Sequence, residues 1–453
     1  MNQSCEHLIL GAGPTGLGAA YRLNELGHSN FIVLEAQDEV GGLSRSYIDK
    51  AGFTWDIGGH VQFSHYPYFD QVMERAVPLS ERQLHDREAW VYFQGEFIPY
   101  PFQNNIHLLA PTLAEDCWEG LKKLDPMNTP PNNFKDWILS QFGQPLSDLF
   151  MLPYNYKVWA HPPELMSYSW IGERVSVVDL ERIKKNFASK RPDQNWGPNN
   201  QFWFPNRGGT GSIWKNVARL CGANNFQFNS TIQHIELKRK CAFLNDGRII
   251  NYKNLLSTIP LPSLTSLLYP TQKEWQHDAA KLLFSSGHII GLGMKGPLPE
   301  QLKKKCWIYF SGPETPCYRI TIFSNYSPYN VPNPGQEYSL LCEVSESKYK
   351  TVASERLMDE VIAGLIKMKF LSPDTEILSK WYFKAHYSYP IPSIERDHLL
   401  KSVLLPLESQ GIFSRGRFGG WKYEVANQDH SFMQGVEWVN KIVCNNKENV
   451  FQV

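Results

Sequence analysis

The chain lacks an excess of either charge, a paired cysteine motif and a long apolar segment. It carries 45 basic and 45 acidic residues, so it offers no broad basic surface for nucleic acids or anionic membranes. Its eight cysteines are scattered without a C-x-x-C pair, which is typical of reduced structural thiols in an intracellular protein. No apolar run reaches the ~18 residues of a membrane span, and the N-terminus shows no secretory pattern. We therefore expect a soluble, cytoplasmic protein without nucleic-acid or membrane partners and without a metal site.

Glycines gather at the start of the chain, between two apolar segments. A short apolar strand over residues 8–10 leads into Gly11, Gly13 and Gly16 with G-x-G-x-x-G spacing, followed by helical periodicity and a second strand, FIVLEA. Gly11 permits a tight turn, Gly13 lets the backbone approach a pyrophosphate, and Gly16 packs helix on strand. Glu35 ends the second strand 19 residues after Gly16, where a carboxylate can hold ribose hydroxyls. This order predicts a β-α-β unit that binds a dinucleotide at the helix N-terminus.

A second glycine pair, Gly41-Gly42, follows soon after this unit and continues as Leu-Ser-Arg. It resembles the glycine-doublet motif of flavoproteins in the amine oxidase and protoporphyrinogen oxidase group, although an ordinary turn could have the same sequence. The resemblance implies FAD rather than NAD as the cofactor, with Gly42 and Ser44 among the residues that bind it.

Changes of pattern along the chain divide it into three parts. Hairpins are predicted at Gln94-Gly95 and Asp246-Gly247, a loop over residues 191–200, and an amphipathic helix over SERLMDEVIAGLIKM. We predict an α/β fold with a discontinuous Rossmann-like FAD-binding domain (1–85, 205–265 and 405–453), an inserted, mainly helical substrate or lid domain (105–190) and a mixed or antiparallel sheet domain for the substrate (86–104 and 266–404).

Further segments resemble the eukaryotic-type UDP-galactopyranose mutases. They are PYPFQNN (99–105), PYNYKVWA (153–160), WIGERV (170–175), NWGPN (195–199), FSNYSPYN (323–330), EVSES (343–347) and GRFGGWKYEVANQDHSF (416–432). Matching segments run from about residue 8 to residue 440, so the resemblance covers nearly the whole chain. The bacterial-type mutases share the glycine motif, but the C-terminal segment resembles them less.

The resemblance implies a site for a nucleotide sugar. Tyr100, Phe102 and Gln103 offer rings and an amide that suit a uracil, although core packing explains the same residues equally well. Arg174 and Arg319 are the implied diphosphate ligands, because a guanidinium matches phosphate oxygens bidentately. The remaining substrate contacts implied by the family are Asn155, Trp159, Asn199, Tyr309, Tyr389 and Tyr423.

The stretch DIGGHVQFSHYPYFD, residues 56–70, places a flexible glycine pair beside a histidine. In the family this loop lies against the isoalloxazine, where a glycine carbonyl can accept from the reduced ring and His60 can respond through its hydrogen bonds. The resemblance makes His60, Arg174 and Arg319 the candidate catalytic residues. The residues implied to contact the flavin from both sides are Gly58, Gly59, Arg417, Asn427, Gln428 and Ser431.

The implied reaction is the interconversion of UDP-galactopyranose and UDP-galactofuranose by an isomerase. Reduced FAD would use N5 as the nucleophile on the anomeric carbon, with NADPH or NADH as reductant. Two other classes stay open, an FAD-dependent oxidase or desaturase of the amine oxidase group and a nucleotide-sugar-binding flavoprotein without turnover. The sequence leaves open the sugar (galactose or N-acetylgalactosamine), the preferred nicotinamide, the oligomeric state (homo-oligomers included) and the role of His65.

Overall fold

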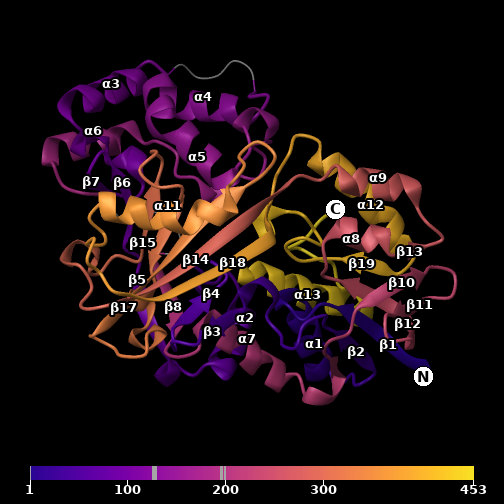
Figure 1. Ribbon diagram of the computed structural model, residues 1–453. Coiled ribbons are helices and arrows are strands. Elements are labelled where there is room, and N and C mark those ends of the chain that lie inside the picture. Colours follow the sequence, from indigo (N-terminus) through magenta and orange to yellow (C-terminus); the bar gives the residue numbers. More distant parts are fainter. Residues whose placement is uncertain (1, 125–129, 194–196, 198–199) are drawn as a thin grey trace.

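Two large β-sheets and a group of helices make up the chain in a computed structural model (Figure 1). The structure describes residues 2–124, 130–193, 197 and 200–453 of the 453 residues. The predicted α/β class is confirmed, because one sheet is built around a β-α-β unit and the other is almost wholly antiparallel.

The first sheet has eight strands in the order β13-β10-β11-β12-β1-β2-β9, with β19 also pairing with β12. These strands are β1 (Asn2–Leu10), β2 (Phe31–Leu34), β9 (Phe226–Gln227), β10 (Ile232–Glu236), β11 (Cys241–Leu244), β12 (Ile249–Ser257), β13 (Leu268–Tyr269) and β19 (Ile412–Ser414). β1 runs parallel to both β2 and β12, which confirms the predicted Rossmann-like core. It is longer than the predicted strand over residues 8–10, because its more polar first half also pairs along β12.

Helices cover both faces of this sheet. The two faces can be followed along β1, because successive residues of a strand point to opposite sides. Ile9 packs with one helical layer, and Leu8 and Leu10 pack with the other. The first layer consists of α1 (Pro14–Glu25), α2 (Pro67–Ala76), α7 (Gly209–Leu220) and α13 (Gln428–Cys444). The second layer consists of α8 (Leu261–Ser266), α9 (Lys273–Ala280) and α12 (Arg396–Ser409).

The first and last helices, α1 and α13, lie against each other at backbone distance. A Cβ atom added at Gly18 would lie 2.1 Å from the carbonyl oxygen of Phe432, and one added at Gly435 would lie 2.0 Å from that of Thr15. Each helix therefore needs its glycine for the other to approach. This contact brings the N-terminus of α13 next to the glycine motif that precedes α1.

The second sheet has seven strands in the order β18-β14-β17-β16-β15-β6-β7. They are β6 (Ala89–Phe93), β7 (Glu96–Pro99), β14 (Phe284–Lys295), β15 (Trp307–Phe310), β16 (Arg319–Ile322), β17 (Glu337–Glu346) and β18 (Ile377–Pro390). β15 and β6 are parallel and the other neighbouring pairs antiparallel, which confirms the predicted mixed or antiparallel sheet. The helix α11 (Ser354–Lys367) packs on one face, and the short helix α10 (Phe323–Tyr326) follows β16.

Two small ribbons link the sheets to the rest of the chain. β3 (Ser46–Ile48) pairs with β4 (Thr54–Asp56), and β5 (Arg82–Asp86) pairs with β8 (Gln201–Pro205). The aromatic residues of these ribbons, including Trp55, pack against the face of the second sheet opposite α11. This packing brings the segment after β4 to β16 and β17.

The helices of the segment predicted to be helical gather at one end of the molecule, near β6 and β7 (Figure 1). They are α3 (Pro111–Lys122), α4 (Phe134–Leu146), α5 (Leu152–Trp159) and α6 (Leu180–Ser189). A π-helical turn over Ser147–Met151 joins α4 to α5. These helices confirm the predicted helical character of the segment, while the boundaries of the three predicted domains stay a prediction. Among the described residues, no helix is both long enough and apolar enough to cross a membrane.

Candidate functional site

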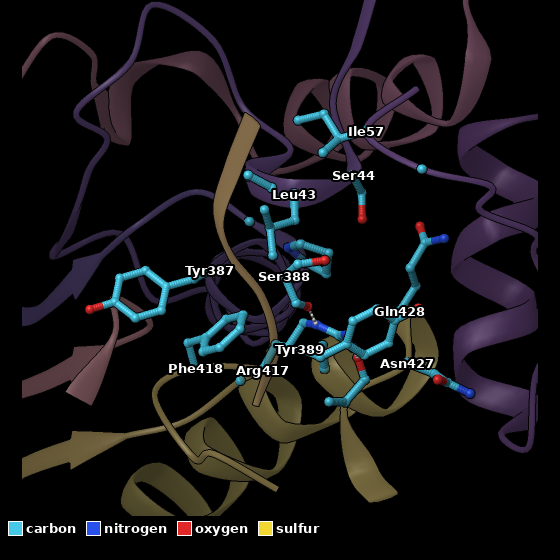
Figure 2. A pocket seen from close by; sticks show the side chains of 18 of the residues that line it. Leu43, Ser44, Ile57, Tyr387, Ser388, Tyr389, Arg417, Phe418, Asn427 and Gln428 are labelled. Carbon is cyan, nitrogen blue, oxygen red and sulfur yellow. Dashed lines mark hydrogen bonds between the residues drawn. The ribbon is translucent and has the colours of Figure 1, made fainter. Parts of the chain in front are cut away.

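A cavity of about 1070 Å³ is lined by residues of both large sheets and of the segment that precedes α13. Figure 2 shows Leu43, Ser44 and Ile57 on one side of this space and Arg417 and Gln428 on the other. Most of the residues predicted from the sequence line it. They are Gly11, Gly13, Glu35, Gly42, Ser44, Gly58, Gly59, His60, Tyr100, Arg174, Tyr309, Arg319, Tyr389, Arg417, Tyr423, Asn427, Gln428 and Ser431.

The two glycine motifs touch each other at the end of β1. Gly11 has a φ of +96°, and a Cβ there would lie 2.3 Å from Thr258 Oγ1. A Cβ at Gly42 would lie 3.2 Å from the Cα of Gly13, so the glycines keep this part of the wall open. Such a cradle at a helix N-terminus fits the pyrophosphate of a dinucleotide. Gly16 does not line the cavity; its missing side chain makes room for the carbonyl of Gly11.

Glu35 stands at the end of β2, where the sequence predicted a ribose ligand. Its Oε2 accepts a hydrogen bond from the Ala12 N–H at 2.8 Å, and its Oε1 accepts one from the Gln37 N–H at 2.9 Å. The carboxylate is thus fixed to the glycine loop and lies in the cavity wall. Its proposed contact with ribose hydroxyls stays a prediction.

The loop after β4 has the glycine conformation that its sequence predicts. Gly58 has a φ of +97°, and its carbonyl accepts from the His60 N–H at 2.9 Å. The Gly59 N–H donates to Glu343 Oε1 at 3.1 Å. His60 Nδ1 is buried and has no hydrogen-bond partner among the described residues. Burial lowers the pKa of His60 to about 4, against the opposing effect of Glu343, so its imidazole is neutral near pH 7.

Four arginines, Arg87, Arg174, Arg319 and Arg417, line the cavity, and the last three differ in whether a carboxylate is paired with them. Arg319 chelates Glu343, with Nε 2.7 Å from Oε1 and Nη2 2.9 Å from Oε2. Arg174 donates to the Glu424 carbonyl at 2.5 Å, and Arg417 donates to the Ser388 carbonyl at 2.9 Å, the bond drawn in Figure 2. Neither forms an ion pair with a carboxylate within the described part of the chain. The part of the cavity around Arg174 and Arg417 therefore holds positive charge without a paired carboxylate, and this charge attracts an anion.

Aromatic rings lie between and beside these arginines. The guanidinium carbons of Arg174 and Arg417 lie 4.9 Å and 5.8 Å from the centroid of Tyr423. Tyr309 packs on Tyr100 at 5.3 Å between centroids. Burial raises the pKa of Tyr309 and of Tyr389, so both phenols stay neutral and can donate hydrogen bonds to an anion. The residue types and their positions suit a phosphate ligand.

The N-terminus of α13 forms another part of the wall. Asn427 stands at the N-cap position without a capping bond from its side chain, Gln428 Oε1 accepts from Trp214 Nε1 at 2.8 Å, and Ser431 follows in the first turn. The buried Asp429 binds His65 Nδ1 at 2.8 Å and His430 Nδ1 at 3.0 Å. This carboxylate therefore fastens the far end of the glycine-histidine loop to α13. The helix N-terminus adds unpaired N–H groups and positive potential to the cavity.

Several predicted substrate residues lie outside the cavity lining. Phe102 stacks on Phe150 with centroids 4.3 Å apart, and Gln103 Nε2 donates to the Ser176 carbonyl at 2.6 Å. Asn155 Nδ2 donates to the Met151 carbonyl, and Trp159 packs edgewise on Tyr423, behind the wall. Asn199 lies outside the described residues. Their roles in substrate binding stay predictions.

Other residues of the site received no role from the sequence. Glu343 lies within the EVSES segment, but the sequence assigns it no role, because its pairing with Arg319 depends on the register of β16 and β17. Tyr387 and Ser388 also line the cavity, but their segment carries no glycine that could have indicated it, whereas Phe418 lies within the quoted segment 416–432 without a role assigned to it.

Comparisons with known proteins agree with this geometry. The model of the flavin containing amine oxidoreductase family matches residues 14–408. A crystal structure of reduced UDP-galactopyranose mutase superimposes with a TM-score of 0.95 at 46% identity, over 98% of this chain and 95% of that one. A CLA-producing fatty acid isomerase from P. acnes has a TM-score of 0.65 at 14% identity, over 97% and 99% of the chains, and shows the fold alone.

The curated relatives are more distant, and the matched region covers a smaller share of each chain. The 15-cis-phytoene desaturase of an Oncidium hybrid cultivar is 35% identical over 309 residues, which is 60% of this chain and 48% of that protein. The 4,4'-diapophytoene desaturase of Staphylococcus aureus (strain Newman) is 23% identical over 339 residues, 65% of this chain and 64% of that protein. The chain thus spans less than two thirds of the length of the curated relatives that it matches.

The fold and the cavity together define a flavoprotein of the amine oxidoreductase type. FAD is the cofactor that this class carries, and the glycine cradle and Glu35 fit it. Within this class, the chain belongs to the family of UDP-galactopyranose mutases.

The neutral state of His60 has a consequence for stability in the FAD-free protein. Because its folded-state pKa of about 4 lies below the unfolded value of about 6.5, this group contributes stability above pH 6.5 that is lost as the pH falls toward 4. We expect the urea midpoint to fall more between pH 7.5 and 5.0 in the unaltered apoprotein than in His60→Gln. Equal losses in the two proteins would show that His60 does not resist protonation.

Proposed function

We propose that this chain is an isomerase that interconverts UDP-galactopyranose and UDP-galactofuranose and acts with reduced FAD. The observation that carries the proposal is the cavity itself, in which Arg174, Arg319 and Arg417 face the same space as the FAD cradle. The similarity to the reduced mutase over nearly the whole length supports the same substrate class.

The protein groups would bind and orient the nucleotide sugar. Arg174 and Arg319 form charge-assisted bonds to the diphosphate, whose charge grows when UDP leaves the sugar. The neutral phenols of Tyr309, Tyr389 and Tyr423 donate further bonds to the same oxygens. When bound and reduced, FAD supplies a nucleophilic N5 for the anomeric carbon. The proposed role of a carbonyl in the Gly58-Gly59 loop is to accept a hydrogen bond from the N–H of the reduced ring.

An FAD-dependent desaturase is the second candidate, since the curated relatives include phytoene desaturases. A carotenoid is a hydrocarbon, and burying it beside Arg174 and Arg417 would leave these two charges without solvent and without a paired carboxylate. The charged cavity therefore favours an anionic substrate over an apolar one. A nucleotide-sugar-binding flavoprotein without turnover would have the same cavity, so only an assay separates it from a mutase.

The deciding experiment incubates dithionite-reduced protein with UDP-galactofuranose and follows UDP-galactopyranose by chromatography. We expect turnover only after reduction, because the oxidised ring has no electron pair at N5 to donate. NADPH or NADH should replace dithionite, with far less than one nicotinamide consumed per sugar converted. Turnover by oxidised enzyme, or one nicotinamide per product, would contradict the proposal, and UDP binding without turnover would favour the binding protein.

Several finer properties stay predictions. The cytoplasmic location is one of them, whereas the oligomeric state, the preference between NADPH and NADH, and the choice between galactose and N-acetylgalactosamine stay open. Activity with UDP-N-acetylgalactosamine in the same assay would decide the last of these.

A further inference from the structure

Glu343 lies at the meeting point of the glycine-histidine loop and the second sheet. The residue is 5% exposed, and its carboxylate accepts four hydrogen bonds. Oε1 accepts from the Gly59 N–H at 3.1 Å and from Arg319 Nε at 2.7 Å. Oε2 accepts from Arg319 Nη2 at 2.9 Å and from the Tyr318 hydroxyl at 2.7 Å. One side chain thus joins the loop expected to face the flavin to the arginine expected to bind diphosphate.

The geometry leaves part of Arg319 available to a ligand. Arg319 and Glu343 stand directly opposite each other in the β16–β17 pair, so the sheet register brings them together. Glu343 occupies the Nε–Nη2 edge of the guanidinium, and no acceptor contacts Nη1 within the residues that the structure describes. A guanidinium can bind one oxyanion at each edge. Glu343 therefore orients Arg319 without using the edge that a phosphate could take.

The same carboxylate also orients the loop. A peptide group is planar, so the Gly59 N–H bond to Glu343 fixes the direction of the Gly58 carbonyl as well. The space is tight: a Cβ at Gly59 would lie 2.5 Å from Thr321 Oγ1 and 3.4 Å from Arg319 Nη2. A shift of Arg319 toward a ligand would therefore displace the Gly58-Gly59 peptide as well, because both bind Glu343 Oε1.

We propose that Glu343 is a positioning residue that orients Arg319 and the Gly58-Gly59 peptide from one carboxylate, and thereby couples diphosphate binding to the redox state of the flavin. The inference rests on the proposed function. Coupling of this kind is reciprocal. If UDP binding changes the equilibrium constant for reduction of the flavin by some factor, reduction must change the affinity for UDP by the same factor.

The test measures the dissociation constant of UDP for the oxidised and for the dithionite-reduced holoenzyme. We expect the two constants to differ in the unaltered protein. In Glu343→Gln the ratio should fall toward one and UDP should bind about 10-fold or more weakly, because the amide cannot accept all four hydrogen bonds. A purely structural role would weaken both redox states equally and leave the ratio unchanged, which would overturn the proposal.

The matched control is Glu346→Gln, three residues further along β17. Glu346 binds His288 and Lys384 and does not line the cavity, so its variant should keep the ratio of the unaltered protein. If Glu343→Gln loses FAD, Glu343→Asp keeps the charge but shortens the side chain, and we expect it to reduce the same ratio. An unchanged ratio in the Asp variant overturns the proposal as well.

The two hypotheses fail in different ways. If the unaltered protein neither binds UDP nor isomerises UDP-galactofuranose, the proposed function fails. If it does both, and its two UDP constants are equal or do not respond to Glu343→Gln, the coupling alone fails. A double variant with Arg319→Lys gives the last check, since Glu343→Gln should add little to the loss of UDP affinity once the chelated guanidinium is gone.

Discussion

Replacement of Arg174 by alanine is expected to lower kcat/KM for UDP-galactofuranose about 10- to 100-fold, as loss of a charge-assisted phosphate contact typically does. Arg174 is held by the Glu424 carbonyl and stacks on Tyr423, so its charge is directed into the cavity without a carboxylate to neutralise it among the described residues. Arg174→Lys should recover part of the loss, because an ammonium keeps the charge but not the planar fork. The measurement is steady-state kinetics of the reduced enzyme.

Arg207→Ala is a suitable control for this variant. Arg207 also stacks on a tyrosine ring, with its guanidinium carbon 3.7 Å from the centroid of Tyr329, but it is exposed and does not line the cavity. It should leave kinetics and FAD content unchanged, and Arg174→Ala should also keep its FAD absorbance near 450 nm. Near-normal kcat/KM in Arg174→Ala would mean that the diphosphate binds elsewhere.

Replacement of Arg415 by methionine is expected to destabilise the protein by about 3–5 kcal/mol, the usual result of removing one partner from a buried ion pair. Arg415 is 1% exposed and bonds to Glu448 through Nε at 2.7 Å and to Glu408 through Nη2 at 2.6 Å. Lys441 would remain near both acids, but Glu448 is only 6% exposed and would lose its bidentate partner. The readout is the urea midpoint of the FAD-loaded protein.

Two further variants test whether the loss of the buried ion pair causes this destabilisation. Arg415→Met combined with Glu448→Gln should be more stable than Arg415→Met alone, because the second change removes the carboxylate left without its partner. Arg356→Met provides the surface comparison, since Arg356 is 74% exposed and 4.0 Å from Glu360, and it should change stability by less than about 0.5 kcal/mol. Equal midpoints for Arg415→Met and Arg356→Met would refute the assignment of a buried ion pair to Arg415.

The parts of the fold that the sequence predicts are those with local signals. The spacing of Gly11, Gly13 and Gly16 predicts the β-α-β unit, and the turns at Gln94-Gly95 and Asp246-Gly247 predict hairpins that the structure contains. The more polar first half of β1 escapes prediction, because its pairing partner, β12, comes more than 200 residues later and no local apolar pattern indicates it.

The site is harder to predict for the same reason. Gly59 and Glu343 are 284 positions apart, so no spacing in the sequence can reveal that they share a hydrogen bond. Conversely, the ring of Phe102 looks equally suitable for a base or for a core until the helical segment supplies Phe150 to stack on it. The role of a glycine motif can be predicted from the local backbone geometry that it allows. The role of a single polar or aromatic side chain depends on the distant residues that pack against it.

The reciprocal glycine contact between α1 and α13 has a consequence for the order in which the protein can fold in the cell. Roughly 400 residues separate the end of α1 from the start of α13, which at about 5–20 residues per second takes from about 20 to about 80 seconds of synthesis. During that time Leu17 and Tyr21 have no α13 to cover them, although both are buried in the finished core. The face of α1 that α13 covers therefore stays exposed on the nascent chain even after α2 and α7 have been made, and the wall that α13 adds to the cofactor pocket is the last part to form.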